Sequence, residues 1–187
     1  MPSGKTHDRI TLWMLPLIVG ACYIVTRDGE LTLLLSGGFY FSGLMFGPDL
    51  DIYSIQFKRW GILRDLWLPY RRFMRHRSFL SHGFIIGTVI RVIYLSCWLI
   101  FAFFLIFGIV SLVLDLEIDG IAWTIQQYNL IKTVYKKEVI ALFLGLEIGA
   151  MSHYISDETD SFLKKRAKRK NPQPKPKRVR RKKKKKQ

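Results

Sequence analysis

The chain has 187 residues, 49% of them apolar, and it carries a formal net charge of +16 at pH 7. That length is enough for one domain with a hydrophobic core, but so many apolar and basic residues together exclude a globular domain in which the two kinds are evenly mixed. The apolar and basic residues must occupy separate segments. Basic segments of this kind bind anionic partners, either lipid headgroups or nucleic acid.

Two uncharged runs near the N-terminus predict a helical hairpin. The first run, residues 10–26, would reach roughly 25 Å as a helix, which is close to the thickness of a hydrocarbon core. The second covers residues 31–48, and a tight polar turn at residues 27–30 separates the two. Gly37, Gly38 and Gly43 would let a neighbouring helix approach closely. Taken alone, these two segments could also be buried helices of a soluble all-α protein.

Two further apolar runs follow. Residues 92–114 contain no charge and are rich in Phe, Leu and Ile, which is typical of a transmembrane helix. We expect Arg91, directly before this run, to extend toward the lipid headgroups. A polar and aromatic connection leads to the last run, residues 139–152, which is short and contains Glu147. This run is a weak candidate for a span by itself, so the topology has to decide it.

The distribution of basic residues favours four crossings with both termini on one side. That side receives the N-terminal basic residues, seven Lys and Arg residues between 58 and 77, and the C-terminal basic run. The other side receives only Arg27 and three lysines between residues 132 and 137. By the positive-inside rule the first side is cytoplasmic. The predicted fold class is therefore an all-α integral membrane bundle of about four transmembrane helices with both termini cytoplasmic.

The loop between the second and third spans, residues 48–83, carries polar motifs at both ends. It opens on Gly-Pro-Asp-Leu-Asp at residues 47–51 and closes on His-Arg-Ser-Phe-Leu-Ser-His-Gly at residues 76–83. Between the motifs, apolar residues recur at three- and four-residue steps among arginines. This pattern predicts an amphipathic segment on an anionic membrane surface, kinked at Pro69. Its apolar residues are Trp60, Leu63, Trp67, Tyr70 and Met74.

The four histidines all lie beside apolar runs, as expected if the hydrophobic segments bring their polar ends to one place. His153 and Asp157 are four residues apart, so one helix face can present both to one cation, although an exposed hydrogen-bonded pair has the same spacing. The other histidines and aspartates at the span ends favour a metal site, because neutral imidazole and carboxylate are ligands of zinc, manganese and iron. The predicted ligands are His7, Asp49, His82, His153 and Asp157 on the cytoplasmic side.

Two pairs of residues in this set leave alternatives open. Asp49 and Asp51 point to opposite faces of an extended turn, so one could bind metal while the other orients a histidine or transfers a proton. On a continuous helix His76 and His82 would project about 120° apart. We therefore expect His82 to be the ligand and His76 to be solvated in a basic face, unless a bend at Ser78 turns it inward.

Three motifs taken in order resemble a family of uncharacterised bacterial metal-binding membrane proteins, over about residues 1–160. They are the two loop motifs and Ser-His-Tyr-Ile-Ser-Asp at residues 152–157. That family is similar to the bacterial membrane-bound metal-dependent hydrolases and, remotely, to the superfamily of zinc-dependent phospholipase C and single-strand nucleases. The resemblance implies a bacterial plasma or internal membrane, and it assigns ligand roles to His7, Asp49 or Asp51, His82, His153 and Asp157.

The resemblance also implies chemistry. Zinc is the expected ion, with manganese and iron as alternatives, and a metal-activated water would attack a phosphoester or another ester. Asp51 is the expected catalytic base, with Asp49 as the alternative. The expected contacts with ligands or substrate are His76, Arg75, Arg77 and Glu147.

The ligand set of the remote superfamily is incomplete in this chain. No histidine follows His153, and Glu147, Glu158 and Asp160 supply only part of the missing set. This favours a one-metal or incomplete two-metal site. The alternative function is a non-catalytic membrane protein whose structural metal holds the helix ends together.

The sequence divides the chain into a helical membrane domain, residues 1–163, and a disordered polybasic tail, residues 164–187. Anionic lipid headgroups are the expected partner of the tail, because attraction to an anionic leaflet contributes about 1 kcal/mol per basic residue near the surface. Nucleic-acid binding, independent of sequence and sensitive to salt, is the alternative. The sequence does not indicate an oligomeric state.

Overall fold

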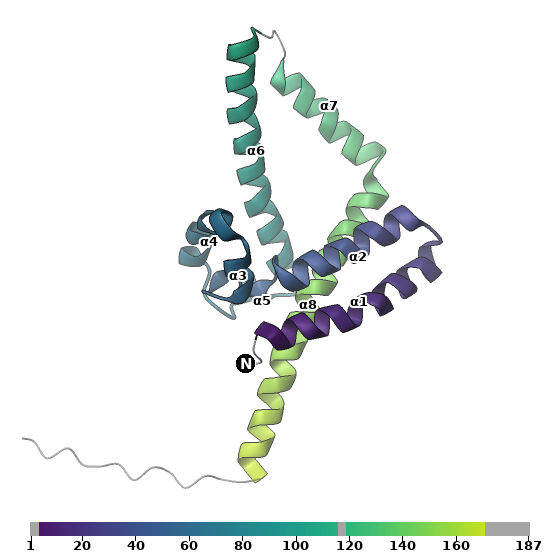
Figure 1. Ribbon diagram of the computed structural model, residues 1–187, viewed down its shortest axis with the longest axis vertical. Helices are drawn as coiled ribbons and strands as arrows, with labels where there is room; N and C mark the ends of the chain where they lie inside the picture. Colours follow the sequence, from purple (N-terminus) through teal and green to yellow (C-terminus); the bar gives the residue numbers. More distant parts are fainter. Residues whose placement is uncertain (1–3, 116–118, 171–187) are drawn as a thin grey trace, which may run out of the picture.

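The computed structural model describes residues 4–115 and 119–170, and within these ranges every regular element is helical (Figure 1). This confirms the all-α prediction. The long helices are α1 (Gly4–Thr26), α2 (Gly29–Leu44), α6 (Ile86–Leu114), α7 (Gly120–Thr133) and α8 (Lys136–Lys170). Between α2 and α6 lie the short elements η1 (Pro48–Asp51), α3 (Ile55–Arg59), η2 (Gly61–Trp67), α4 (Leu68–Phe73) and α5 (Phe79–His82).

The predicted hairpin is formed by α1 and α2 (Figure 1). Oδ1 of Asp28 caps α2 by accepting hydrogen bonds from the backbone N–H groups of Glu30 and Leu31, at 2.8 and 3.1 Å, which satisfies two donors that a helix start leaves free. Gly43 lies close to Thr11, since a Cβ at this glycine would lie 2.5 Å from the Thr11 hydroxyl oxygen. The C-terminal end of α2 therefore lies beside the N-terminal part of α1.

Small residues also let α2 pack closely on α8. A Cβ at Gly145 would lie 2.0 Å from the backbone oxygen of Leu35, and one at Gly149 would lie 2.6 Å from that of Phe39. Residues 35 and 39 thus face residues 145 and 149, so the two helices run in the same direction. Of the glycines predicted to permit a close approach, Gly38 faces α8 and Gly43 faces α1, whereas nothing lies within 4 Å of a Cβ at Gly37.

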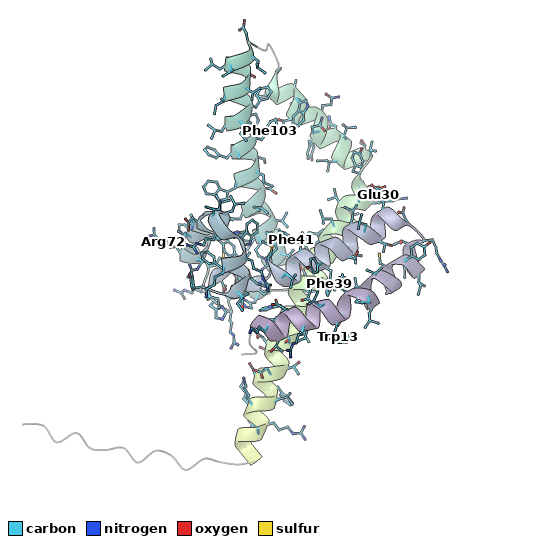
Figure 2. All side chains as sticks on the ribbon, viewed as in Figure 1. Trp13, Glu30, Phe39, Phe41, Arg72 and Phe103 are labelled. Carbon is cyan, nitrogen blue, oxygen red and sulfur yellow. The ribbon has the colours of Figure 1, made fainter. Side chains whose placement is uncertain are left out.

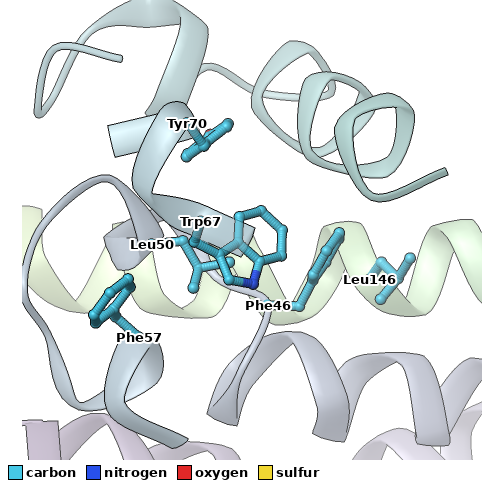
Figure 3. Packing of buried hydrophobic residues seen from close by; sticks show 6 residues of the cluster. All are labelled: Phe46, Leu50, Phe57, Trp67, Tyr70 and Leu146. Atoms are coloured by element: carbon cyan, nitrogen blue, oxygen red, sulfur yellow. The ribbon is translucent and has the colours of Figure 1, made fainter. Parts of the chain in front are cut away.

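The loop after α2 folds around an aromatic core. Trp67 is fully buried, with its ring centroid 5.7 Å from that of Phe46 and 5.6 Å from that of Tyr70 (Figure 3). The prediction that residues 60–74 form an amphipathic surface segment is therefore wrong for Trp67 and Tyr70. These two residues are buried against the end of α2 and against η1. Pro69 lies in the first turn of α4, where its missing N–H costs no hydrogen bond, and it does not kink a longer helix. The cluster consists of Phe46, Leu50, Phe57, Trp67, Tyr70 and Leu146.

Among the described residues, four helical stretches are long and apolar enough to cross a membrane: α1, Gly29–Asp51 (α2 with the segment through η1), α6 and Lys136–Ala167 of α8. The most apolar stretch of α6 has no buried residue. In the second half of α6, Phe103, which is labelled in Figure 2, stacks on Trp123 of α7 at 4.9 Å between ring centroids. Arg91 is an exception on α6, since it is 1% exposed. The expectation that it extends to lipid headgroups is wrong, because its guanidinium donates to the backbone oxygen of Ser81 and to the Thr88 hydroxyl, each at 2.9 Å.

Three helices extend well beyond their predicted ranges, and the first is α1, which starts at Gly4 and not at residue 10. Helix α6 starts at Ile86, before the uncharged run. Helix α8 covers residues 136–170, longer than the apolar run at 139–152, and it passes the expected domain boundary at Leu163. Lys164 pairs with Asp160 at 2.6 Å, one helical turn earlier, which favours continuation of the helix there. The rest of the predicted tail, residues 171–187, lies outside the described residues.

Candidate metal centre

The chain's four histidines lie in one cluster with buried carboxylates. Two groups of three residues each present ligand atoms within 4.8 Å of one another: His7, His153 and Asp157, and Asp49, His76 and His82. The first group joins α1 to α8, and the second joins η1 to the segment around α5. The structure therefore brings together all five predicted ligands, which come from the start of α1, the segment after α2, the segment before α6 and the middle of α8.

The first group is almost closed to solvent. The side chains of His7 and Asp157 are each 6% exposed, and His7 Nε2 lies 3.2 Å from Asp157 Oδ1. The rings of His7 and His153 stack at 3.8 Å between centroids. His153 and Asp157 are one turn apart on α8, so both face α1. Each of these residues, with its backbone included, is 4% exposed. The i, i+4 pair is thus a buried pair and not the exposed alternative.

The second group depends on a turn that the sequence did not locate. The chain leaves helical geometry after Phe73, and Arg77 adopts φ +59° before α5 begins. This reversal brings His76 Nδ1 to 3.0 Å from Asp51 Oδ1. His76 and His82 are therefore not on one helix, and their ring centroids lie 5.1 Å apart. The His76 side chain remains 29% exposed, so the bend turns it inward without burying it.

Asp49 and Asp51 face different histidines. They belong to the 3-10 helix η1 and not to an extended turn. Asp49 Oδ2 lies 3.3 Å from His153 Nε2, whereas the two oxygens of Asp51 lie 3.0 Å from His76 Nδ1 and 3.7 Å from His82 Nδ1. Asp49 thus lies between the two groups of possible ligands. The Asp51 side chain is fully buried and forms a hydrogen bond with His76 of the second group.

Hydrogen bonds hold the elements that carry these residues. Arg59 of α3 forms a two-pronged ion pair with Asp8, next to His7, with N–O distances of 2.8 and 2.5 Å. The Gln56 side-chain amide donates to the backbone oxygen of Gly43 at 3.0 Å. These contacts attach α3 to the start of α1 and the end of α2. They fix the positions of His7 and η1 relative to each other.

A chain of polar contacts supports His82. Its Nδ1 lies 2.7 Å from Ser81 Oγ, and the Ser81 hydroxyl can donate to the backbone oxygen of Arg75 at 3.3 Å. In that arrangement His82 Nδ1 carries the proton and Nε2 has the free lone pair. Burial lowers the pKa of His82 to about 4, so the imidazole is neutral at pH 7, as a metal ligand must be. Ser81 and Arg91 are supporting residues that sequence reasoning missed, because a serine and an arginine beside apolar runs carry no distinctive spacing.

The remaining predicted residues lie outside the two groups. Glu147 is buried, and its Oε1 accepts a hydrogen bond from the backbone N–H of Ile85 at 2.9 Å. This carboxylate therefore binds the start of α6, where Ile85 has φ +62°. Arg75 and Arg77 are exposed on the loop beside His76.

The cavities at the cluster are small. One of about 20 Å³ touches His7, Asp49 and His153, and another of about 10 Å³ touches His82 and Glu147. Each has room for about one water molecule. A much larger groove of about 900 Å³ runs between α1 and α8, and Glu147 and Met151 line both this groove and the cavity at His82. A substrate-sized space thus borders the cluster but does not reach the histidines.

The donor atoms fit a divalent cation. Buried ligand atoms on both sides have no hydrogen-bond partner among the described residues: His7 Nδ1, His82 Nε2, both ring nitrogens of His153, Asp49 Oδ1 and both oxygens of Asp157. Polar atoms buried without partners are costly. Two ligand atoms that are each about 2.1 Å from a tetrahedral ion lie about 3.4 Å apart, close to the 3.2 and 3.3 Å between the imidazole and carboxylate atoms of the first group and Asp49.

Comparison with known proteins agrees with this geometry. The model of a family described as "Uncharacterized metal-binding protein (DUF2227)" matches residues 2–167, a range that includes every residue of the cluster. An uncharacterized protein of Aquifex aeolicus (strain VF5) is 36% identical over 59 residues, which cover 31% of this chain and 41% of that protein. No solved structure matches the chain. The chain belongs to the DUF2227 family of metal-binding proteins.

Proposed function

We propose that this protein is a membrane-embedded, metal-dependent hydrolase of a phosphoester or another ester. The observation that carries the proposal is the buried cluster of histidine and aspartate atoms without hydrogen-bond partners. The family that the sequence motifs around these residues resemble is itself similar to the bacterial membrane-bound metal-dependent hydrolases. Zinc is the proposed ion, because four imidazoles with carboxylates are a ligand set that zinc accepts.

The proposed topology has four spans with both termini in the cytoplasm of a bacterial cell. The exposed apolar surface of α6 supports a lipid environment. The directions of the helices support the topology: α2 and α8 run in the same direction, and the start of α1 lies beside the end of α2. In this topology α2 and α8 run toward the cytoplasm and α1 runs away from it. The parts of these helices next to the cluster thus lie on one side of the membrane. The C-terminal basic run would lie there too and contact anionic headgroups.

The residues of the chain have distinct proposed roles. His7, Asp49, His82, His153 and Asp157 would hold the metal, together with His76. When bound, such an ion lowers the pKa of water and polarises an ester oxygen. Asp51 would hold His76 in position through its Nδ1 atom, as carboxylates do for metal-bound histidines, and Ser81 would do the same for His82. Asp51 is the proposed base, because its Oδ2 has no hydrogen-bond partner among the described residues, and Asp49 would then be a ligand.

The groove between α1 and α8 is the proposed binding site for the apolar part of a substrate. It is lined mainly by apolar residues of both helices and ends at Glu147 and Met151, next to the cavity at His82. An ester with an apolar chain could lie in the groove with its polar group near the metal. The exposed Arg75 and Arg77 are proposed to attract a phosphate.

A structural metal is the second candidate function, favoured by the small cavities at His82 and His153. The two functions are separated by assaying zinc-loaded protein in lipid nanodiscs with phospholipids and with soluble phosphoesters, comparing the wild type with His153→Ala. The hydrolase proposal predicts turnover that chelation and His153→Ala both abolish. Metal-loaded wild type that hydrolyses no ester faster than His153→Ala would leave only the structural role.

A further inference from the structure

We infer that the cluster holds two divalent cations, which share the carboxylate of Asp49. The inference rests on the proposed metal binding and goes beyond it in the number of ions and in their bridge. The first site would consist of His7, His153 and Asp157, and the second of His76 and His82. Asp49 would contribute one oxygen to each site.

The number of donors exceeds what one such ion takes. A zinc ion in a protein site has about four ligands, whereas six residues place ligand atoms within the two groups. The groups are also carried by different parts of the chain: the first by α1 and α8, and the second by η1 and the segment around α5. Only Asp49 has close contacts with both, because it belongs to the second group and its Oδ2 lies 3.3 Å from His153 Nε2.

Each side of Asp49 has atoms that still need a partner. On the first side, both oxygens of Asp157 and both ring nitrogens of His153 are buried without a hydrogen bond from the described residues. On the second side, His82 Nε2 is also buried without a hydrogen-bond partner among the described residues, and the His82 side chain is only 5% exposed. Asp49 Oδ1 is buried and unpartnered as well. One ion on the first side would leave His82 Nε2 and Asp49 Oδ1 unsatisfied.

The charges also favour two ions. The side chains of Asp49, Asp51 and Asp157 are 13%, 0% and 6% exposed, so three carboxylates are crowded into a site with little water. Buried carboxylates are stable when paired with cations or coordinated to metal. The imidazoles must be neutral to bind metal, so they cannot supply the compensating charge. Two divalent cations can.

Hydrogen bonds orient the rings of His76 and His82, so the second site is preorganised to bind metal. Asp51 Oδ1 holds His76 Nδ1 at 3.0 Å, and Ser81 Oγ holds His82 Nδ1 at 2.7 Å. Both rings are thus fixed through one nitrogen, with the other available. Arg91 fixes Ser81 in turn, through the backbone oxygen at 2.9 Å. A hydrogen bond at the far nitrogen is the usual support of a histidine that binds metal.

Manganese loading provides the test, because it counts ions and detects a bridge. Purified full-length protein is loaded with Mn²⁺, freed of excess metal and analysed by elemental analysis and by electron paramagnetic resonance at low temperature. We expect two ions per chain in the wild type, with a spectrum split by exchange coupling between them. The variants His82→Ala and Asp157→Ala should each retain one ion and give the six-line spectrum of isolated Mn²⁺. The control Glu158→Ala, an exposed carboxylate beside Asp157, should retain both.

The contrary outcomes are distinct. One ion per chain in the wild type would overturn the second site and leave the proposed metal binding intact. Two ions without exchange coupling would overturn the shared Asp49. A wild type that binds no divalent ion would overturn both this inference and the proposed function. Because the wild-type spectrum alone decides each case, a variant that fails to fold does not rescue the inference.

Discussion

His153 Nε2 lies 3.3 Å from Asp49 Oδ2, yet the two atoms do not form a hydrogen bond. The two residues are far apart in the sequence, and each lies where an apolar helix meets a polar segment. Their contact requires that α2 and α8 run in the same direction with their backbones close together. The glycines of α8 make that approach possible, so the metal centre and the helix packing depend on each other.

Enlarging the packing glycines should destabilise the protein. In Gly145→Ala the new methyl group would meet the backbone oxygen of Leu35 at 2.0 Å, and in Gly149→Ala that of Phe39 at 2.6 Å. Backbone atoms cannot move aside cheaply, so a loss of about 1–3 kcal/mol is expected, as for other overpacked sites. Thermal unfolding in detergent measures it. The matched control is Gly37→Ala, which has open space, and an equal loss in that variant would contradict the packing account.

The metal-free protein should lose stability as the pH falls below about 6.5. Burial lowers the pKa of His82 from 6.5 to about 4, so in this interval the unfolded chain binds a proton that the folded chain does not. The contribution of His82 is complete above pH 6.5, declines toward pH 4, and amounts to about 3 kcal/mol at most. Unfolding midpoints of wild type and His82→Asn across this range provide the measurement. Equal pH dependence in the two proteins would show that His82 contributes nothing.

Removing bound metal should lower the unfolding temperature. A ligand that binds only the folded state stabilises it by about 2.7 kcal/mol at one hundred times its dissociation constant. Chelation should therefore reduce the midpoint of the metal-loaded wild type. The midpoint of Asp157→Ala should change much less. A variant that responds to the chelator as strongly as the wild type would show that its stabilising ion binds elsewhere.

The two sides of the membrane can be distinguished by cysteine labelling. In a background with Cys22 and Cys97 replaced by serine, Glu30→Cys lies in the first turn of α2, next to the connection from α1, and Ile62→Cys lies at a position that is 95% exposed in the loop. A membrane-impermeant maleimide added to intact bacterial cells should label the first cysteine. The second should react only after permeabilisation. The reverse pattern would place the cluster on the outer side.

The long apolar helices and the meeting of their polar ends could be predicted from the sequence, because both follow from local patterns. Hydrophobic length marks α6, and the i, i+4 spacing marks His153 and Asp157. The turn that brings His76 to Asp51 was predicted only as an alternative, as a bend at Ser78. It depends on a positive φ at Arg77. This backbone conformation is uncommon for arginine, so the residue type does not predict it.

The burial of Trp67 and Arg91 could not be predicted from the sequence either. Trp67 among arginines has the pattern of a membrane-surface segment, but its neighbours in space are Phe46 and Tyr70, which come from separate elements. Arg91 at the edge of an apolar run has the pattern of a residue that reaches the headgroups. Its true partners, Ser81 and Thr88, became apparent only from the fold of α5 onto α6. Tertiary contacts override both patterns.

Metal binding by the buried histidine and aspartate cluster can be measured as the metal content of purified protein, in the wild type, in Asp157→Ala and in Glu158→Ala. These adjacent carboxylates differ in burial, since Asp157 is 4% exposed and Glu158 is exposed. The account predicts stoichiometric divalent metal in the wild type and in Glu158→Ala, with a clear loss in folded Asp157→Ala. Equal metal content in all three proteins would contradict it.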